Sequence, residues 1–452
     1  MQIIVVGCGN VGRTLIEQLV KEGHDVTAVD LDKSRVEQVV REYDVMGYIG
    51  NGASRTLLID AGVKKADVLL AVTAADELNL LCCLIARKAG DCKTIARVRN
   101  PIYTLEEVSF IKEELGLSLI INPEMAAAHE IARLIKFPSA IRVENFAKGR
   151  LDLLGCRVKE GSELAGCALM DITSKHNVNM LVIAVQRKGE VVIPNGQYVL
   201  EEGDVVYFVA EPTKVMQSMK KLGNVNRKVH KVMIIGGGET TVYLSKHLLN
   251  IGIHVTIIES SKERCGELSE LLPNALVICG DGTDRELLLE EGIESMNIVV
   301  AWTNFDEENI MLSLYAQQHA KAKAITKIHK IEHDEILQTL DVGSICYPKK
   351  ITAERILQYI RAMNNSMGSN VETLYQLVDD RIEVLEFVVR SNHDFLGIPL
   401  EKLHLKKNLL IACIVRAGKF IIPGGKDEIR MNDSVIVVTM DRGLECISDI
   451  MR

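Results

Sequence analysis

Short apolar runs alternate with longer stretches of helical spacing through the first 120 residues of the chain. These runs have the length of buried strands, and they read IIVVG, DVTAVD, VLLAVT, TIARV and LSLII. Continuous apolar strands separated by helices are typical of a parallel sheet covered by helices on both faces. After that point the runs become short strands with hairpin-like turns, such as LVIAVQ and DVVYFVA. The pattern predicts a doubly wound domain followed by a small β-rich lobe.

The same pattern occurs twice along the chain. KVMIIGGGETTVYLSKHLLNIGIHVTIIES repeats the first 30 residues, GDGTDRELLLEEGI repeats GNGASRTLLIDAGV, and RAGKFIIPGG repeats RKGEVVIPNG. A repeat of this length indicates a duplicated pair of domains rather than a solenoid. We therefore predict an α/β protein with two Rossmann-like doubly wound parallel-sheet domains, each followed by a small β-rich α+β lobe.

Helix-start residues and loop-like segments set the expected domain boundaries. Asn122 followed by Pro123 is typical of a helix N-terminus, and the second copy has a counterpart in YPKKITAERILQYI. We expect N-terminal lobes at 1–122 and 229–347, a bridging helix at 123–138, a bridging helix with linker at 348–369, and C-terminal lobes at 139–222 and 370–452.

Glycines follow the first strand at the spacing of a dinucleotide-binding turn. In IIVVGCGNVG, Gly7 allows the turn, Gly9 lets the backbone approach a pyrophosphate, and Gly12 permits helix-on-strand packing. The phosphates would then lie at a helix N-terminus. Asp30 ends the second strand, where it would accept hydrogen bonds from a ribose 2′-hydroxyl and repel a 2′-phosphate. We therefore expect NAD or an adenine nucleotide in preference to NADP.

Residues that follow the next strands should complete this pocket, because ligands lie beyond the carboxyl ends of parallel strands. The arginines of ARVRNP alternate, so both should face one side, where guanidinium groups suit phosphates or a partner's carboxylates; surface salt bridging is the alternative. The candidates are Asn51, Thr73, Ala74, Arg97 and Arg99.

Several residues near the predicted pocket do not need a role in binding. Cys8 can simply fill space in the turn, and Asp76 and Glu77 can cap the next helix and complement its dipole. His329 and His333 are four residues apart but have no apparent third ligand, so we expect no metal site.

The second copy of the site is altered. Thr241 replaces the third glycine, and a larger residue there should loosen or shift the helix against the strand. We expect nucleotide binding in the second half to be weaker, different or absent. The other counterparts are Gly236, Gly238, Glu259, Asn304 and Lys327.

Composition narrows the class of partner. The chain has 452 residues, 47% of them hydrophobic and 4% aromatic, and a formal net charge of -8. This charge argues against nucleic acid or an anionic lipid surface as the main partner. No apolar run approaches the roughly 18 residues of a membrane span, and the chain begins on a strand without signal-peptide features, so we expect a cytoplasmic protein. The 11 cysteines lack CxxC spacing, which fits a reducing compartment without a disulfide framework.

The duplication accounts for nearly all residues and leaves none for a conventional catalytic domain. The chain contains no GxSxG, Walker A, HExxH or CxxC motif. We therefore expect a protein that senses a nucleotide rather than an enzyme that consumes it.

The motifs IIVVGCGNVG, GNGA, AVTAADELNLL and IARVRNP, in a doubled fold with a β-rich module after each copy, resemble the TrkA family of regulatory subunits of Trk-type potassium uptake systems. The resemblance covers essentially the whole chain. It implies tandem RCK domains (regulators of potassium conductance) that bind NAD(H) or ATP/ADP. It also implies a homo-oligomeric ring, a tetramer of such chains, on the cytoplasmic face of a separate potassium-translocating membrane protein.

The resemblance also implies which residues hold the nucleotide. The first site would comprise Gly7, Cys8, Gly9, Asn10, Val11, Asp30, Asn51, Thr73, Ala74 and Arg97. The second would comprise Gly236, Gly238, Glu259, Asp281, Thr303, Asn304 and Lys327.

The favoured hypothesis is a non-catalytic regulator of potassium uptake whose nucleotide shifts the population of two ring geometries. One alternative is an NAD-dependent oxidoreductase, which rests on fold analogy alone. Another is a related RCK-type sensor for a different channel or transporter.

Overall fold

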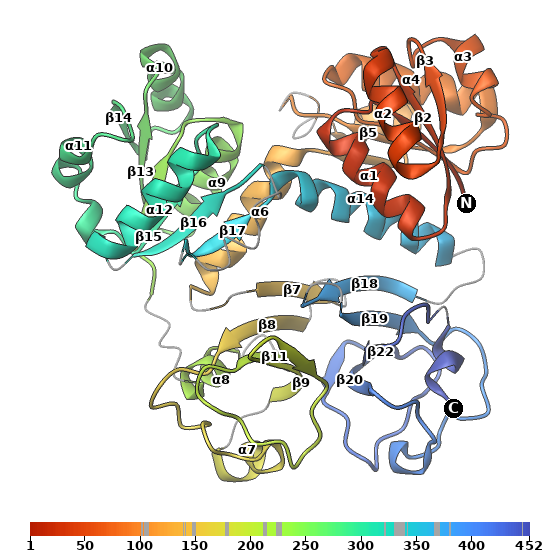
Figure 1. The fold of residues 1–452 in the computed structure, drawn as a ribbon, viewed down its shortest axis with the longest axis vertical. Helices are drawn as coiled ribbons and strands as arrows, with labels where there is room; N and C mark the ends of the chain where they lie inside the picture. The colour runs from red at the N-terminus through yellow and green to blue at the C-terminus, as the bar shows by residue number, and fades with distance from the viewer. Residues whose placement is uncertain are drawn as a thin grey trace. The chain divides into compact units, whose positions relative to one another are not determined.

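The computed structural model describes two compact units, each of which combines parts of both halves of the chain. The first unit comprises Met1–Ala132 and Val229–Leu357, and the second comprises Arg133–Lys228 and Gln358–Arg452 (Figure 1). The residues described are 1–100, 103, 108–138, 140, 142–146, 151–176, 180–210, 215–222, 228–320, 322–329, 340, 342–365, 371–378, 381–444 and 446–452.

The first half of the chain contributes a six-stranded parallel sheet with the order β3-β2-β1-β4-β5-β6 to the first unit. Its strands are β1 Gln2–Val6, β2 Asp25–Asp30, β3 Met46–Ile49, β4 Val68–Ala71, β5 Lys93–Arg97 and β6 Leu119–Ile121. The intervening helices are α1 Asn10–Lys21, α2 Lys33–Tyr43, α3 Arg55–Asp60, α4 Asp76–Gly90 and α5 Val108–Glu114. The order reverses between β1 and β4, which places a ligand crevice beyond their carboxyl ends.

The second half repeats this sheet as β14-β13-β12-β15-β16-β17. Its strands are β12 Lys231–Ile235, β13 His254–Glu259, β14 Leu276–Cys279, β15 Ile298–Ala301, β16 Lys323–Lys327 and β17 Ser344–Cys346. Its helices are α9 Glu239–Asn250, α10 Lys262–Leu271, α11 Arg285–Glu290, η3 Ile293–Ser295 and α12 Asp306–Ala320. The registers also agree, because Val6 pairs with Ala71 as Ile235 pairs with Ala301. The two predicted Rossmann-like domains are confirmed.

A helix follows the last strand of each sheet, and both helices begin at the predicted prolines: α6 spans Pro123–Lys136 and α14 spans Pro348–Asn365. The Asn122 carboxamide oxygen accepts from the Met125 N–H at 2.8 Å, so it caps α6 as expected. The Asn122 carboxamide nitrogen donates to the Tyr243 hydroxyl on α9 at 3.1 Å. The start of α6 is therefore attached to the Rossmann domain of the other half.

The second unit contains two five-stranded sheets with equivalent orders, β10-β9-β11-β8-β7 and β18-β19-β22-β20-β21. The first comprises β7 Arg142–Phe146, β8 Leu151–Arg157, β9 Met180–Arg187, β10 Glu190–Val192 and β11 Val205–Ala210, with helices α7 Leu169–His176 and α8 Val215–Lys221. The second comprises β18 Val371–Leu377, β19 Ile382–Val388, β20 Leu409–Arg416, β21 Lys419–Ile421 and β22 Ser434–Thr439, with η4 Leu400–Lys402 and η5 Ile447–Ile450. All strand pairs in both sheets are antiparallel. The predicted β-rich lobes are thus confirmed.

One hydrophobic core joins these two sheets. Ile183 and Val209 of the first sheet belong to the same buried cluster as Val384 and Val438 of the second. Burial of apolar surface from both repeats makes each lobe depend on the other for part of its stability.

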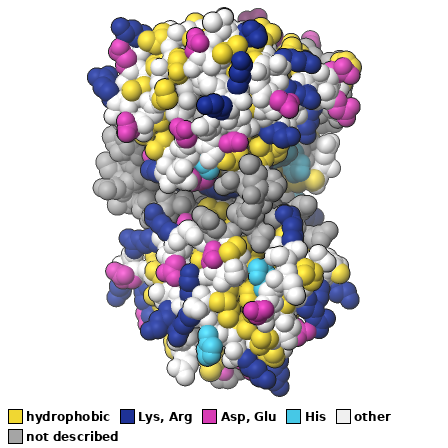
Figure 2. All heavy atoms as spheres, turned by 90° about the vertical axis from the view of Figure 1, so that its right-hand side faces the viewer, with side chains coloured by type: hydrophobic (Ala, Val, Ile, Leu, Met, Phe, Trp, Pro, Cys, Tyr) yellow, Lys and Arg dark blue, Asp and Glu magenta, His cyan; other side chains and the backbone are white. Residues whose placement is uncertain are grey.

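On the face shown in Figure 2, Lys and Arg side chains are interspersed with Asp and Glu side chains in both units. Among the residues that the structure describes, no helix combines the length and the apolar composition that a bilayer span requires.

The turn from β1 to α1 explains the third glycine of the motif. Gly7 has a φ of 104°, and a Cβ atom on Gly12 would lie 1.7 Å from the Gly7 carbonyl oxygen. The second half instead has Thr241, whose hydroxyl donates to the Gly236 carbonyl oxygen at 2.6 Å. The second turn therefore accommodates a buried side chain where the first has no space for one.

We expect Gly12→Ala to destabilise the first unit by about 1–3 kcal/mol or more, because overpacking forces the turn and helix apart. Gly266→Ala is the matched control, because Gly266 lies in α10 with nothing within 4 Å of its added Cβ. The control should stabilise the chain by about 0.5–1 kcal/mol through helix propensity. Denaturant unfolding followed by circular dichroism measures both; equal effects would contradict this account of the turn.

Candidate functional site

The structure brings the first glycine-rich turn and the predicted ribose-binding acid together. The Asp30 carboxylate accepts from the backbone N–H of Cys8 at 2.6 Å and from that of Asp32 at 2.9 Å. The free N–H groups at the start of α1 lie just beyond this turn, where an anion is favoured. Burial, then the charge of Asp30, raises the pKa of the Cys8 thiol to about 12. The burial of this thiol is in keeping with a packing role.

An arginine that sequence reasoning missed lies beside this turn. Nη1 of Arg35, on α2, is 3.9 Å from the position that a Cβ atom on Gly9 would take. Its Nε is 3.4 Å from the exposed Asp32 carboxylate, a weak surface ion pair that a phosphate can replace. The available signal was an arginine five residues after the acid in both halves, since Arg264 follows Glu259 as Arg35 follows Asp30.

The ends of β4 and β5 are held together by a buried asparagine that the sequence analysis also missed. The Asn79 carboxamide oxygen accepts from the Thr73 N–H at 2.8 Å, and its nitrogen donates to the Arg97 carbonyl oxygen at 2.8 Å. In the second half Asn309 makes the same two bonds, to Thr303 at 2.8 Å and Lys327 at 3.1 Å. The signal was the asparagine shared by DELNLL and DEENIM.

Asp76 and Asp306 each begin a helix, and each also holds the backbone that follows the next strand of its sheet. Asp76, the first residue of α4, accepts from the N–H groups of Arg99 and Asn100 at 2.9 and 2.8 Å. Asp306 accepts from the His329 N–H at 2.9 Å, and its carboxylate lies 3.0 Å from Nδ1 of that ring. His333 lies outside the described residues. Among the residues described, no group of three or more His, Cys, Asp or Glu side chains could hold a metal ion.

Both predicted arginines reach the loop after β4. Nη1 of Arg97 donates to the Thr73 carbonyl oxygen at 3.4 Å, and Nη2 of Arg99 donates to that of Ala74 at 2.6 Å. Nε of Arg97 is buried and has no hydrogen-bond partner among the described residues. Burial, then the charge of Arg99, lowers the pKa of Arg97. An anion in this crevice would relieve both effects.

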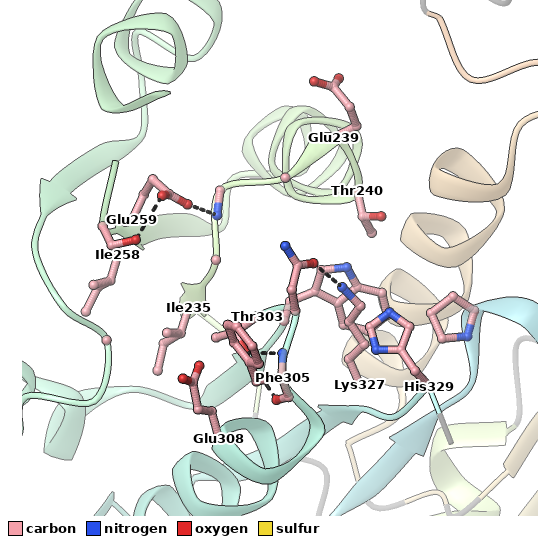
Figure 3. Close-up of a pocket in the computed structure, with 18 of the residues that line it drawn as sticks. Ile235, Glu239, Thr240, Ile258, Glu259, Thr303, Phe305, Glu308, Lys327 and His329 are labelled. Atoms are coloured by element: carbon pink, nitrogen blue, oxygen red, sulfur yellow. Dashed lines mark hydrogen bonds between the residues drawn. The ribbon is translucent and has the colours of Figure 1, made fainter. Parts of the chain in front are cut away.

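The second half contains a well-formed pocket of about 690 Å³ at the carboxyl edge of its sheet (Figure 3). Trp302 and Phe305 add aromatic surface to its lining, and Glu124 comes from α6 of the first half. The pocket brings together all of the predicted second-site residues, namely Gly236, Gly238, Glu259, Asp281, Thr303, Asn304 and Lys327.

The acid of the second pocket is held as in the first. The Glu259 carboxylate accepts from the Gly237 N–H at 2.7 Å (Figure 3). It also accepts from the Ser261 N–H at 2.7 Å. The turns after the third strands also agree, because Asn51 accepts from the Ala53 N–H at 2.9 Å and Asp281 from the Thr283 N–H at 2.8 Å.

The lysine that lines the second pocket and the arginine beside its glycine-rich turn are less available to a ligand than the arginines of the first half. Lys327 is only 8% exposed, its Nζ lies 5.5 Å from the Trp302 ring centroid, and burial lowers its pKa. Arg264 donates to the Gly237 carbonyl oxygen at 2.8 Å and pairs with Glu239 at 2.9 Å. Glu239 opens α9, where the first half has Asn10, and its charge competes with a phosphate for the helix N-terminus.

Glu124 was not predicted, and it connects the two sites electrostatically. Its Oε2 is buried without a hydrogen-bond partner among the described residues, and burial raises its pKa. The positive charges of Arg97 and Arg99 lower the pKa of Glu124 and so oppose the effect of burial. The charge of Glu124 raises the pKa of Lys327 and so favours its charged form. No sequence signal marked this residue, because its neighbours come from both halves.

Comparison with protein families shows two matches, each present twice. The TrkA-N domain family matches residues 3–123 and 232–348, and the TrkA-C domain family matches residues 153–223 and 384–451.

Relatives of full length are also found. The chain is 36% identical over 453 residues to the Trk system potassium uptake protein TrkA homolog of Archaeoglobus fulgidus, with 100% of both chains covered. It is 30% identical over 445 residues to the Trk system potassium uptake protein TrkA of Haemophilus influenzae, with 98% of this chain and 96% of that one covered.

Among solved structures, the one described as "GsuK channel bound to NAD" has a TM-score of 0.63 and 16% identity, with 97% of this chain and 76% of that chain covered. A likeness at this identity shows the fold.

We expect Glu239→Asn, which installs the first-half residue, to raise the affinity of the second pocket for ADP by about 2- to 30-fold, as for removal of an unfavourable charge at a helix N-terminus. Calorimetry on an Asp30→Ala background isolates this pocket. Glu267→Gln is the control, because Glu267 also pairs with Arg264, at 2.6 Å, but does not line the pocket. An equal gain in both variants would contradict a specific role for Glu239.

Proposed function

The chain belongs to the TrkA family of Trk system potassium uptake proteins, and from that premise we propose that it is a nucleotide-binding regulatory subunit. It binds NAD(H), or ATP and ADP at the same site, and gates potassium uptake through a separate Trk-type membrane protein. It acts without chemical turnover, on the cytoplasmic face of the membrane, as a homotetrameric ring. We propose for its lobes the boundaries expected from the sequence.

The observation that carries this proposal is that a ligand in the second pocket would contact both halves of the chain. The glycine-rich turn and Glu259 come from the second half, whereas Pro123, Glu124 and Ala127 come from α6, the helix that follows the Rossmann domain of the first half. A ligand that fits one arrangement of these surfaces better than another shifts the population between them. A coupling of about 1–3 kcal/mol is typical of such linkage.

The chemistry of the first site supports a nucleotide with an unmodified ribose and two or more phosphates. Asp30 offers its carboxylate beside the turn, and Arg35 and the unpartnered Nε of Arg97 offer positive charge to the phosphates. The fold likeness to a channel described as bound to NAD is consistent with this ligand class.

The two sites differ in a way that suits different ligands or different occupancies. Within the part of the chain that the structure describes, Arg35 of the first site makes only the exposed ion pair with Asp32, whereas Arg264 of the second half is bound by Glu239, Glu267 and the Gly237 carbonyl. We infer that the first site binds the more highly charged nucleotide more tightly.

Asp30→Ala should weaken NADH or ADP binding by about 1.5–3 kcal/mol, the scale of charge-assisted hydrogen bonds, which is roughly 10- to 150-fold in affinity. Glu259→Ala should reduce the amount of bound nucleotide by less than Asp30→Ala does. Asp25→Ala, at the opposite end of β2, removes the same charge and should have no effect. Isothermal titration calorimetry with the full chain measures all three; unchanged affinity in Asp30→Ala would place the site elsewhere.

We expect the purified chain to bind NADH without oxidising it, so its absorbance at 340 nm should stay constant. In cells whose growth at low potassium depends on the membrane partner, Asp30→Ala should alter rubidium uptake and Asp25→Ala should not. Sustained NADH oxidation would favour an oxidoreductase. Normal uptake by an Asp30→Ala chain that has lost nucleotide binding would refute gating by this site.

A further inference from the structure

Two cysteines lie beside Glu259, the acid of the second pocket. Cys279 ends the edge strand β14, in register with Glu259 on β13, and its side chain is exposed. Cys265 lies on α10, is buried, and donates from its thiol to the Glu259 carbonyl oxygen at 3.3 Å. Burial, then a hydrogen bond between the two thiols, raises the pKa of Cys265 to about 11.

The first half shows that this place in the fold does not require cysteine. The equivalent residues are Val36 on α2 and Ile49 at the end of β3. Two hydrocarbon side chains in one repeat are therefore replaced in the other by two cysteines, each of which lies beside Glu259. A space-filling role would explain the buried thiol, but it does not explain an exposed one beside it.

We propose that Cys265 and Cys279 form a reversible disulfide that modulates ligand binding in the second pocket. The disulfide itself depends only on the thiol pair, whereas its effect on a nucleotide rests on the function proposed above. The oxidant is a low-molecular-weight disulfide.

The exchange proceeds in two balanced steps. The exposed Cys279, as a thiolate, attacks one sulfur of the small disulfide, forms a mixed disulfide and releases one small thiolate. Cys265 then loses its proton and attacks the Cys279 sulfur, which expels the second small thiolate. Two protein thiols are oxidised, one small disulfide is reduced to two thiols, and a small thiol in excess reverses both steps.

The new bond would change the groups that line the second pocket. It removes the Cys265 S–H donor from the Glu259 carbonyl and ties α10 to β14. The Glu259 carboxylate bonds to Gly237 and Ser261, and Arg264, next to Cys265, bonds to the Gly237 carbonyl. A shift of α10 therefore moves the acid and the arginine beside the turn together.

The test uses the full chain treated with oxidised glutathione, followed by alkylation, digestion and mass spectrometry. We expect a peptide cross-linked between Cys265 and Cys279 that disappears after dithiothreitol. On an Asp30→Ala background, oxidation should change ADP affinity in the second pocket by about fivefold or more, the lower end of typical coupling. Cys265→Val and Cys279→Ile, which install the first-half residues, should remove both effects and retain the fold.

Recovery of both cysteines as alkylated thiols or as separate glutathione adducts would overturn the disulfide. A cross-linked peptide with unchanged ADP affinity would overturn its control of the pocket. If the reduced chain binds no ADP in the second pocket, this control over the pocket fails, while the cross-linked peptide still decides whether the disulfide forms. Loss of nucleotide binding at the first site as well would refute the proposed function separately.

Discussion

Both Rossmann domains depend on one hydrogen bond between a strand-end carboxylate and the backbone of the glycine-rich turn. The Cys8 N–H donates to Asp30 at 2.6 Å and the Gly237 N–H to Glu259 at 2.7 Å. This bond holds the turn against the second strand and leaves the helix N-terminus free to meet an anion. It is kept although the acid is one methylene longer in the second half, so the position of the carboxylate outweighs its identity.

The surroundings of this bond differ between the repeats, mainly in charge. In the first crevice Arg35 is held only by a weak, exposed ion pair with Asp32 among the described residues, and within that same part of the chain the buried Nε of Arg97 has no hydrogen-bond partner. In the second, Arg264 is committed to Glu239 and Lys327 is buried against Trp302. Two copies of one fold thus present two crevices that differ in the charge around the same carboxylate.

Residues of each half also pack against the other half. Glu124 from the first half lines the pocket of the second, and Asn122 bonds to Tyr243 on α9. In the second unit the sheets of both halves share one core through residues such as Val209 and Val384. The helices α6 and α14 each cross the boundary between the units, at Ala132 and Leu357. Covalent connection and shared burial therefore link each ligand pocket to parts of the chain that do not touch the ligand.

The sequence by itself determined the two parallel sheets, the two β-rich lobes, the glycine-rich turns and their acids. These depend on local periodicity, glycine stereochemistry and a repeat that shows each motif twice, as with Gly7 and Gly236. Tertiary structure alone decided that the halves combine into shared units, that Glu124 lines the pocket of the other half, and that Cys265 and Cys279 both lie beside Glu259. Such contacts join residues far apart in the chain, and they depend on which faces pack together, which no local pattern encodes. Asn79 and Asn309 combine both kinds of information. The repeat shows that both halves have this asparagine, but only the tertiary structure shows that it bonds to the backbone at the ends of two adjacent strands.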